Sequence, residues 1–248
     1  MAVIAGNWKM HRGPAETRAF FAALALDDVP DRHELLIFPP ALSLEAAFAA
    51  RPPRVRLGVQ NVHWEDEGAF TGEVSASMAR DAGATFALIG HSERRHVFGE
   101  TDEQVARKTA AVVRNGLIPV VCVGETLAER RAGRVDEVIL RQLDAVLAKL
   151  AEVSRVLIAY EPVWAIGTGE TATPADASAA HKTLRRRLRE GLGDAPGGRV
   201  ALLYGGSVKP GNAAELLAAD EVQGLLIGGA SLDPVSFAKI ASAAPAGR

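Results

Sequence analysis

The chain has 248 residues, of which 48% are hydrophobic and 23% are charged, and its formal net charge at pH 7 is −2. This composition supplies a large core, and the near-neutral charge lacks the strongly basic footprint of a nucleic-acid-binding protein. Since no Ser/Gly-rich or Pro-rich linker interrupts the sequence, we expect a single domain over residues 1–248 and no nucleic-acid partner.

The amino-terminal residues and the cysteine content indicate where the protein works. The apolar stretch at residues 1–6 is too short for a signal peptide, and no run approaches the ~20 apolar residues of a membrane helix. Cys122 is the only cysteine, which excludes an intramolecular disulfide and fits a reducing compartment. Its apolar neighbours predict a buried hydrophobic role. We therefore expect a cytoplasmic protein with no membrane partner.

Short aliphatic runs recur along the chain, each followed by Gly, Pro or polar residues and then by a helical pattern. Continuous apolar runs, as opposed to alternating ones, are typical of strands that are buried on both faces. The eight predicted strands cover residues 3–5, 35–38, 56–60, 86–89, 118–123, 156–160, 200–204 and 225–227.

Helix starts are recognisable between these strands. Capping side chains stand before an acceptor or a proline, which suits the first helical turn. These pairs are Thr101 with Gln104, Thr173 with Asp176, and Asp233 with Pro234. Apolar residues at three- and four-residue spacing predict helices over 136–151 and 174–190. The second helix carries the basic run 185–189, which we expect to form a solvated face with local ion pairs.

Alternating strands and helices are compatible with a closed (β/α)8 barrel or with an open, doubly wound sheet. An open dinucleotide-binding sheet favours a Gly-rich fingerprint after its first strand, where this chain has Asn7-Trp8-Lys9. The sequence therefore predicts an α/β fold in the form of a single-domain, closed (β/α)8 barrel.

In such a barrel the residues directly after the strands line one rim, where active sites lie. This rim collects a lysine, a histidine, several carboxylates and two glycine pairs. Its members are Asn7, Lys9, Asn61, His91, Glu93, Glu125, Glu161, the segment 205–207 and the pair 228–229.

Glu161 ends an apolar strand and is followed at once by Pro162. A Trp-Ala-Ile tip then leads into Gly167-Thr168-Gly169. An isolated loop glutamate is usually a surface residue, but a tip that contains Trp164 is unsuited to permanent exposure. We interpret Glu161 as a base held rigidly at the barrel mouth, and the segment 162–172 as a lid with a stiff start and a permissive end.

Three further rim residues each have a structural and a chemical interpretation. Lys9 is either a surface lysine or a buried ammonium that stabilises developing negative charge. His91 is either structural or, because it precedes a helix N-terminus, a neutral imidazole able to donate a proton. Glu93 is either a first-turn carboxylate or a residue that positions Lys9 or His91.

The pairs Gly205-Gly206 and Gly228-Gly229 follow the last two predicted strands. Paired glycines let backbone N–H groups approach a ligand, and loops at these places form the usual phosphate site of the barrel. Two tight turns are the alternative, but their joint placement favours phosphate, with Ser207 and Gly167 as further donors. The sequence contains no metal-binding motif or cofactor fingerprint, so we expect no metal and no cofactor. A base, a neutral acid, a cation and a phosphate site together fit proton transfer next to a carbonyl.

The segments Asn7-Trp8-Lys9, 91–95 (HSERR) and 159–169 (AYEPVWAIGTG) closely resemble the triosephosphate isomerase family, and the resemblance runs from Gly6 to about Phe237. It implies a TIM barrel that interconverts dihydroxyacetone phosphate and D-glyceraldehyde 3-phosphate through an enediolate, without a cofactor. The roles established for triosephosphate isomerases, including lid closure, then apply to the matching positions. Glu161 is the base, neutral His91 polarises the carbonyl, Lys9 with Asn7 and Glu93 stabilises the oxyanion, and Asn7, Lys9, Gly167, Ser207, Gly228 and Gly229 bind the substrate and its phosphate.

The resemblance also implies a homodimer in which the loop Asn61–Glu73 inserts beside the partner's active site. The apolar tip Ala69-Phe70 of this loop needs cover, and Thr71 is expected to reach Asn7 and Lys9 of the other chain.

Three positions depart from the family pattern, namely Glu170, Gly211 and Gln223. Gln223 replaces a common aspartate and puts in doubt an ion pair with the arginine run, for which Arg187 is the expected partner.

Two other functions compete with this interpretation. A pentose-phosphate epimerase would need a metal set or paired acidic residues, which the sequence does not offer. A phosphometabolite-binding barrel without catalysis would tolerate changes at Lys9, His91 or Glu161, and all three are intact.

Overall fold

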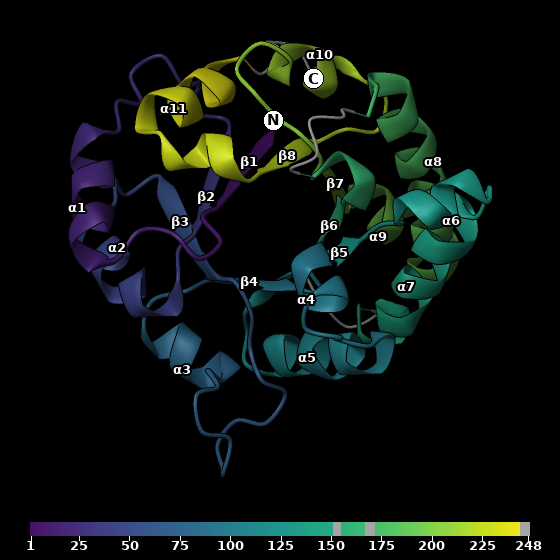
Figure 1. Ribbon diagram of the computed structural model, residues 1–248, viewed down its shortest axis with the longest axis horizontal. Coiled ribbons are helices and arrows are strands. Elements are labelled where there is room, and N and C mark those ends of the chain that lie inside the picture. Colours follow the sequence, from purple (N-terminus) through teal and green to yellow (C-terminus); the bar gives the residue numbers. More distant parts are fainter. Residues whose placement is uncertain (151–154, 167–171, 244–248) are drawn as a thin grey trace.

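The structure, a computed structural model, describes residues 1–150, 155–166 and 172–243. Eight parallel strands form a closed barrel in which each strand pairs with the next along the chain and the last pairs with the first (Figure 1). Val3 lies opposite Glu34 on one side and Gly224 on the other. The strands are β1 (Val3–Asn7), β2 (Glu34–Phe38), β3 (Val55–Val59), β4 (Phe86–Ile89), β5 (Ile118–Val123), β6 (Leu157–Tyr160), β7 (Ala201–Tyr204) and β8 (Gly224–Ile227). The predicted closed barrel is confirmed.

Helices surround the barrel (Figure 1). They are α1 (Pro14–Ala23), α2 (Leu44–Ala50), α3 (Ala76–Asp81), α4 (Ser92–His96), α5 (Asp102–Arg114), α6 (Leu127–Arg131), α7 (Val135–Leu150), α8 (Pro174–Leu192), α9 (Asp194–Arg199), α10 (Ala213–Ala218) and α11 (Pro234–Ser242), with short 3-10 turns η1 (Ala41–Ser43), η2 (Val163–Ala165) and η3 (Gly229–Leu232). The predicted helix starts are confirmed, since Thr101, Thr173 and Asp233 each cap a helix with their side chains. Within the described parts of the chain, no helix is long and apolar enough to cross a membrane.

Both faces of the strands are buried, which explains their continuous apolar sequences. Alternate residues such as Phe38, Leu88 and Leu203 fill the inside of the barrel. The residues between them, such as Ile37 and Ile89, pack outward against the helices. Filling of this kind makes the barrel a packed core whose ends alone are free to form a site.

Cys122 lies inside the barrel and is completely buried. Burial, with the nearby charge of Glu161 as the second cause, raises the pKa of its thiol well above the ordinary value. The expectation of a buried hydrophobic cysteine is confirmed.

The basic run on α8 is less solvated than expected. Arg185 is buried, and it forms an ion pair of 3.0 Å with Glu221 and a hydrogen bond of 3.0 Å to the side-chain oxygen of Gln223. Arg187 instead pairs with Asp144 at 2.7 Å. The expected partner of Gln223 was therefore wrong. Arg185 occupies the face of α8 that turns toward the barrel, where its charge requires acceptors.

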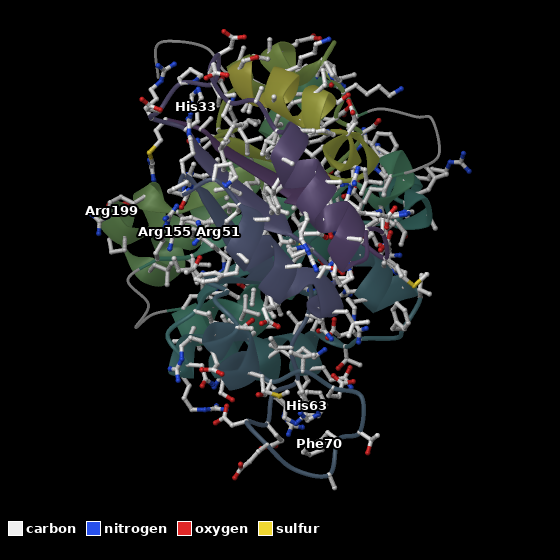
Figure 2. The ribbon with its side chains drawn as sticks, turned by 90° about the vertical axis from the view of Figure 1, so that its left-hand side faces the viewer. His33, Arg51, His63, Phe70, Arg155 and Arg199 are labelled. Carbon is white, nitrogen blue, oxygen red and sulfur yellow. The ribbon has the colours of Figure 1, made fainter. Side chains whose placement is uncertain are left out.

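The loop between β3 and α3 projects away from the barrel (Figure 1). His63 and Phe70 both lie at this end of the molecule, as Figure 2 shows. The Phe70 ring stacks on His63 with a centroid distance of 4.1 Å, yet 42% of Phe70 remains exposed. The loop therefore carries an apolar tip that its own chain covers only in part.

Candidate active site

A cavity of about 290 Å³ opens at the carboxyl ends of the strands. Its lining joins residues from loops far apart in the sequence. The predicted members are Asn7, Lys9, His91, Glu161, Gly205, Gly206, Ser207, Gly228 and Gly229, and the further ones are Ile166, Val208, Lys209, Leu226 and Ala230. The tertiary structure thus brings the predicted base, proton donor, cation and glycine pairs into one site.

Backbone contacts on both sides fix Glu161 at the end of β6. Its N–H donates to the Val123 carbonyl at 2.8 Å, and the N–H of Gly205 donates to the Tyr160 carbonyl at 2.7 Å. A Cβ atom at Gly124 would lie only 1.8 Å from the Glu161 carbonyl oxygen, so only glycine permits this approach. Strands β5 and β7 therefore hold the backbone of Glu161 from either side.

The Glu161 carboxylate is buried and hydrogen-bonded at both oxygens. Oε1 lies 2.9 Å from Nε2 of His91, and Oε2 accepts a 2.8 Å hydrogen bond from the N–H of Ser92. Burial alone would raise the pKa of this carboxyl, but the charge and hydrogen bond of His91, together with the Ser92 N–H, lower it overall. Glu161 is therefore an ionised carboxylate in a dry site.

His91 caps the amino terminus of α4 through its ring. Its Nδ1 accepts from the N–H of Glu93 at 3.2 Å, so the proton of the neutral imidazole lies on Nε2 and faces Glu161. Burial is the largest single influence and lowers the pKa of His91, but the charge and hydrogen bond of Glu161 and the charge of Glu93 together raise it overall. A proton on Nδ1 would point at the N–H of Glu93, and this arrangement opposes the cationic form. It favours the neutral, Nε2-protonated form.

Lys9 adopts a backbone conformation that is rare for a residue with a side chain. Its φ is +51°, and its N–H donates to Oδ1 of Asn7 at 3.0 Å. The Gln60 side chain donates to the carbonyl of Lys9 at 2.8 Å and to that of Phe38 at 2.8 Å. The ammonium lies 2.5 Å from Oε1 of Glu93. Asn7 and Gln60 therefore fix the backbone of Lys9, whereas Glu93 holds its charge.

The glycine pairs and the loop after β7 form the other wall of the cavity. Asn212 braces this loop, because its side chain accepts from the N–H of Lys209 at 2.8 Å and donates to the Ser207 carbonyl at 3.1 Å. Lys209 also lines the cavity, which adds a second cation to that of Lys9. Two ammonium groups and glycine-rich backbone give a wall suited to a phosphate group.

Two functional residues escaped the sequence analysis. Gln60 was assigned as the last residue of a predicted strand, whereas the observed β3 ends at Val59 and leaves Gln60 on the rim. Lys209 lies in the same loop as the pair Gly205-Gly206, a few residues further along the chain. Extending the predicted rim into that loop would have found it. Asn61, in contrast, accepts a 2.8 Å hydrogen bond from Lys108 and is not part of the cavity lining.

The first part of the predicted lid is anchored to the barrel. The indole N–H of Trp164 donates to Oε1 of Glu125 at 2.8 Å, and the Tyr160 hydroxyl donates to Oε2 of the same carboxylate at 3.0 Å. Ile166 reaches the cavity. Gly167, Thr168 and Gly169, which were expected to bind phosphate or act as a hinge, lie outside the described residues, as does Glu170, which departs from the family pattern.

Within residues 1–150, 155–166 and 172–243, no three or more His, Cys, Asp or Glu side chains gather closely enough to hold a metal ion. The chemistry that this site offers from its own side chains is that of an ionised carboxylate, an imidazole N–H and two ammonium groups. Such a set transfers protons and stabilises an oxyanion.

Comparison with known proteins adds a separate finding. The family model described as triosephosphate isomerase matches residues 2–244. A triosephosphate isomerase of Solibacter usitatus (strain Ellin6076) is 50% identical over 242 residues, which cover 96% of this chain and 97% of the relative. Those of Moorella thermoacetica and Halorhodospira halophila are 48% and 49% identical, over 96% and 99% of this chain and 96% and 98% of theirs.

Proposed function

The chain belongs to the triosephosphate isomerase family, and we propose that Glu161, His91 and Lys9 carry its catalysis. It is an isomerase that interconverts dihydroxyacetone phosphate and D-glyceraldehyde 3-phosphate, a reaction of glycolysis. The observation that supports the assignment of residues is the shared cavity, in which a carboxylate, an imidazole N–H and an ammonium face one space bounded by two glycine loops.

Glu161 acts as the general base. Its lowered pKa keeps it ionised at neutral pH, and burial means that little water competes for it. It removes the proton from the carbon next to the substrate carbonyl and returns that proton to the neighbouring carbon. Its hydrogen bonds to His91 and to the Ser92 N–H must give way to the substrate as this step begins.

His91 and Lys9 stabilise the negative charge that forms on oxygen. The Nε2–H of His91 donates to the carbonyl oxygen and passes protons between the two oxygens of the enediolate. The Lys9 ammonium supplies fixed positive charge, with Asn7 and Glu93 holding it in place. Groups that are ordered before the reaction need no reorganisation when the charge develops.

The phosphate group of the substrate binds at the opposite wall. Ser207, Gly228 and Gly229 line that wall, and Gly167 is the expected further donor from the lid. Lys209 joins this group as a cation. Binding the phosphate away from the reacting carbons holds the substrate in one orientation relative to Glu161.

The lid covers the substrate once it has bound. An enediolate phosphate in water can expel its phosphate, so Trp164 and Ile166 seal the site while Gly167 holds the phosphate oxygens. Removing residues 165–168 should reduce isomerisation and raise the share of substrate lost to methylglyoxal and inorganic phosphate. An unchanged elimination share would mean that the lid binds substrate without protecting the intermediate.

A coupled assay of the conversion of glyceraldehyde 3-phosphate to dihydroxyacetone phosphate tests the activity. Glu161→Gln should lower kcat by about 10²–10⁴-fold, the usual worth of a positioned base, with little change in fold. Glu103→Gln is the matched control, because that exposed carboxylate in the first turn of α5 does not line the cavity. Near-normal turnover of Glu161→Gln would contradict the role of Glu161.

We further propose that the protein is a homodimer through the loop Asn61–Glu73. Phe70 is 42% exposed at its tip, Phe98 is 66% exposed, and both line one hollow beside the loop. Apolar side chains gathered in this way favour cover by a partner, with Thr71 reaching Asn7 and Lys9 of the other chain.

Sedimentation at micromolar concentration tests the dimer. Phe70→Asp should lower the sedimenting mass and the activity together. Val235→Asp, at a comparably exposed apolar residue on α11, should change neither. A fully active species with the 26.1 kDa mass of one chain would contradict the proposal.

We also propose that residues 1–248 act as one domain in the cytoplasm and without a cofactor. The family match over residues 2–244 and the barrel core shared by β1 to β8 support the single domain. The buried free thiol of Cys122 supports a reducing compartment.

A further inference from the structure

A second cavity of about 290 Å³ lies at the opposite end of the barrel from the active site. Residues at the starts of β1, β6 and β7 form its floor, among them Val3, Val156 and Val200. Arg155 and Arg199 lie on one side of the molecule in Figure 2, away from the loop that carries His63 and Phe70. We call this cavity the arginine pocket.

Four arginines line the arginine pocket, and Glu221 is the single carboxylate in its lining among the described residues. The arginines are Arg155, Arg185, Arg189 and Arg199. Gln223 contributes a neutral amide. Like charges of this number repel one another, and the low-dielectric walls of a concave surface strengthen their field.

Two of the arginines already have acceptors within the fold. Arg185 is buried, and it binds Oε2 of Glu221 at 3.0 Å and the carbonyl of Gly197 at 2.6 Å. Arg155 donates through both terminal nitrogens to the carboxylate of Glu34. These side chains form a rigid part of the wall, and carboxylates balance their charges, although Glu34 also pairs with Arg56 at 2.9 Å.

Arg189 and Arg199 have no such balance. Among the residues that the structure describes, neither guanidinium lies within 4.0 Å of a carboxylate, and both side chains belong to exposed residues. Burial raises the pKa of Glu221, but the hydrogen bond and charge of Arg185, the hydrogen bond of Gln223 and then the charge of Arg189 lower it overall. That carboxylate is already bound to Arg185, so two positive charges remain without a counter-ion.

We propose that the arginine pocket binds a doubly charged tetrahedral oxyanion, either free phosphate or the phosphate group of a small ester. The planar fork of a guanidinium matches two oxygens of phosphate, and two uncompensated guanidinium groups match the charge of about −1.5 to −2 that a phosphate monoester carries at pH 7. The anion bridges Arg189 and Arg199 over the fixed wall of Arg155 and Arg185.

The arginine Nε–H signals in proton–nitrogen NMR spectra test this site selectively. The described lining of the catalytic cavity contains no arginine, so phosphate bound there does not contact an arginine directly. Sodium phosphate is added to the whole protein at pH 7.5 with ionic strength held constant by chloride. We expect the signals of Arg189 and Arg199, and those of Arg155 and Arg185 in the pocket wall, to shift and saturate, with assignments from Arg189→Ser and Arg199→Ser.

Arg186→Ser is the matched control, because Arg186 is an exposed residue of α8 that does not line the pocket. The double variant Arg189→Ser/Arg199→Ser should lose the saturable shifts at Arg155 and Arg185, whereas Arg186→Ser should keep them. Inhibition of isomerisation by phosphate should be the same in all variants, because this inhibition comes from phosphate bound in the active site at the other end of the barrel.

Two further titrations identify the ligand. Sulfate, which remains doubly charged, should bind equally at pH 7.5 and pH 5.5, whereas phosphate should bind more weakly at pH 5.5 because it gains a proton. Stronger binding of glycerol 3-phosphate than of phosphate would identify an ester as the ligand, and equal binding would identify the free anion.

Shifts no larger than those caused by chloride, or equal shifts at Arg186, would reduce the effect to general attraction of counter-ions and overturn the proposal. A parallel change in catalytic inhibition when Arg189 and Arg199 are replaced would place the bound phosphate in the active site and would overturn it as well.

Discussion

The Nε2 atom of His91 lies 2.9 Å from Oε1 of Glu161, and both side chains are almost completely buried. Each group changes the pKa of the other: His91 lowers the pKa of Glu161, and Glu161 raises that of His91. A single hydrogen bond therefore joins the proposed base to the proposed proton donor. The substrate has to replace this bond in order to engage both groups.

Glu161→Gln should lower the pKa of His91. Burial pulls this pKa down, and the Glu161 carboxylate is the largest influence that raises it. A neutral amide removes that influence and leaves burial to dominate. NMR titration of the His91 ring measures the change. Glu93→Gln should give a smaller fall, because its carboxylate lies 3.8 Å from Nδ1. An unchanged or raised pKa in Glu161→Gln would refute the coupling.

Gly124→Ala should impair catalysis without touching a side chain of the site. The new Cβ would lie 1.8 Å from the carbonyl oxygen of Glu161, so the end of β6 must shift. Misplacing a reacting group by about 1 Å can cost about 10² in kcat. In Gly13→Ala the new Cβ meets nothing within 4 Å, so kcat should stay unchanged. Steady-state kinetics with circular dichroism as a folding check decide the matter, and parental turnover in Gly124→Ala would contradict the prediction.

Glu93→Gln should lower kcat by up to about 10²-fold, because the Lys9 ammonium loses the carboxylate that holds it at 2.5 Å. Glu93→Asp should recover part of the loss, since it restores the charge at a shorter reach. Glu103→Gln, an exposed carboxylate in the first turn of α5, is the control and should behave as the parent. Equal kcat in Glu93→Gln and Glu103→Gln would show that Lys9 needs no such support.

Stability should fall as the pH is lowered from about 6.5 to about 4 because of His181. Burial lowers the pKa of this histidine from its ordinary 6.5 to about 4. In that window the unfolded chain binds a proton that the folded chain does not, so the free energy of unfolding decreases with falling pH, by an amount on the order of 3 kcal/mol.

Urea unfolding at pH 6.5, 5.5 and 4.5 measures this effect. His181→Gln should flatten the pH dependence, while His11→Gln, at an exposed position, should leave it unchanged. A pH dependence in His181→Gln as steep as in the parent would assign the loss of stability to other groups.

Sequence patterns alone predicted the barrel because each strand is buried on both faces and several helix starts are capped by a nearby side chain. Thr101 and Thr173 bond to residues three positions away, so their signals lie within one helical turn. Part of the site could be predicted from the rule that the residues directly after the strands line the rim. This rule found Glu161 and His91. That rule missed Lys209 and Gln60, since it reads only the first residues after a predicted strand end.

The sequence could not decide which residues that are distant along the chain come into contact. The contact between His91 and Glu161 depends on the closure of the barrel, which brings the end of β4 close to the end of β6. The same closure sets Arg185 against Gln223, although the arginine run by itself suggested Arg187. Local hydrogen bonds and periodic burial are encoded in short segments, whereas charge pairing across a closed barrel is fixed only when all strands have found their neighbours.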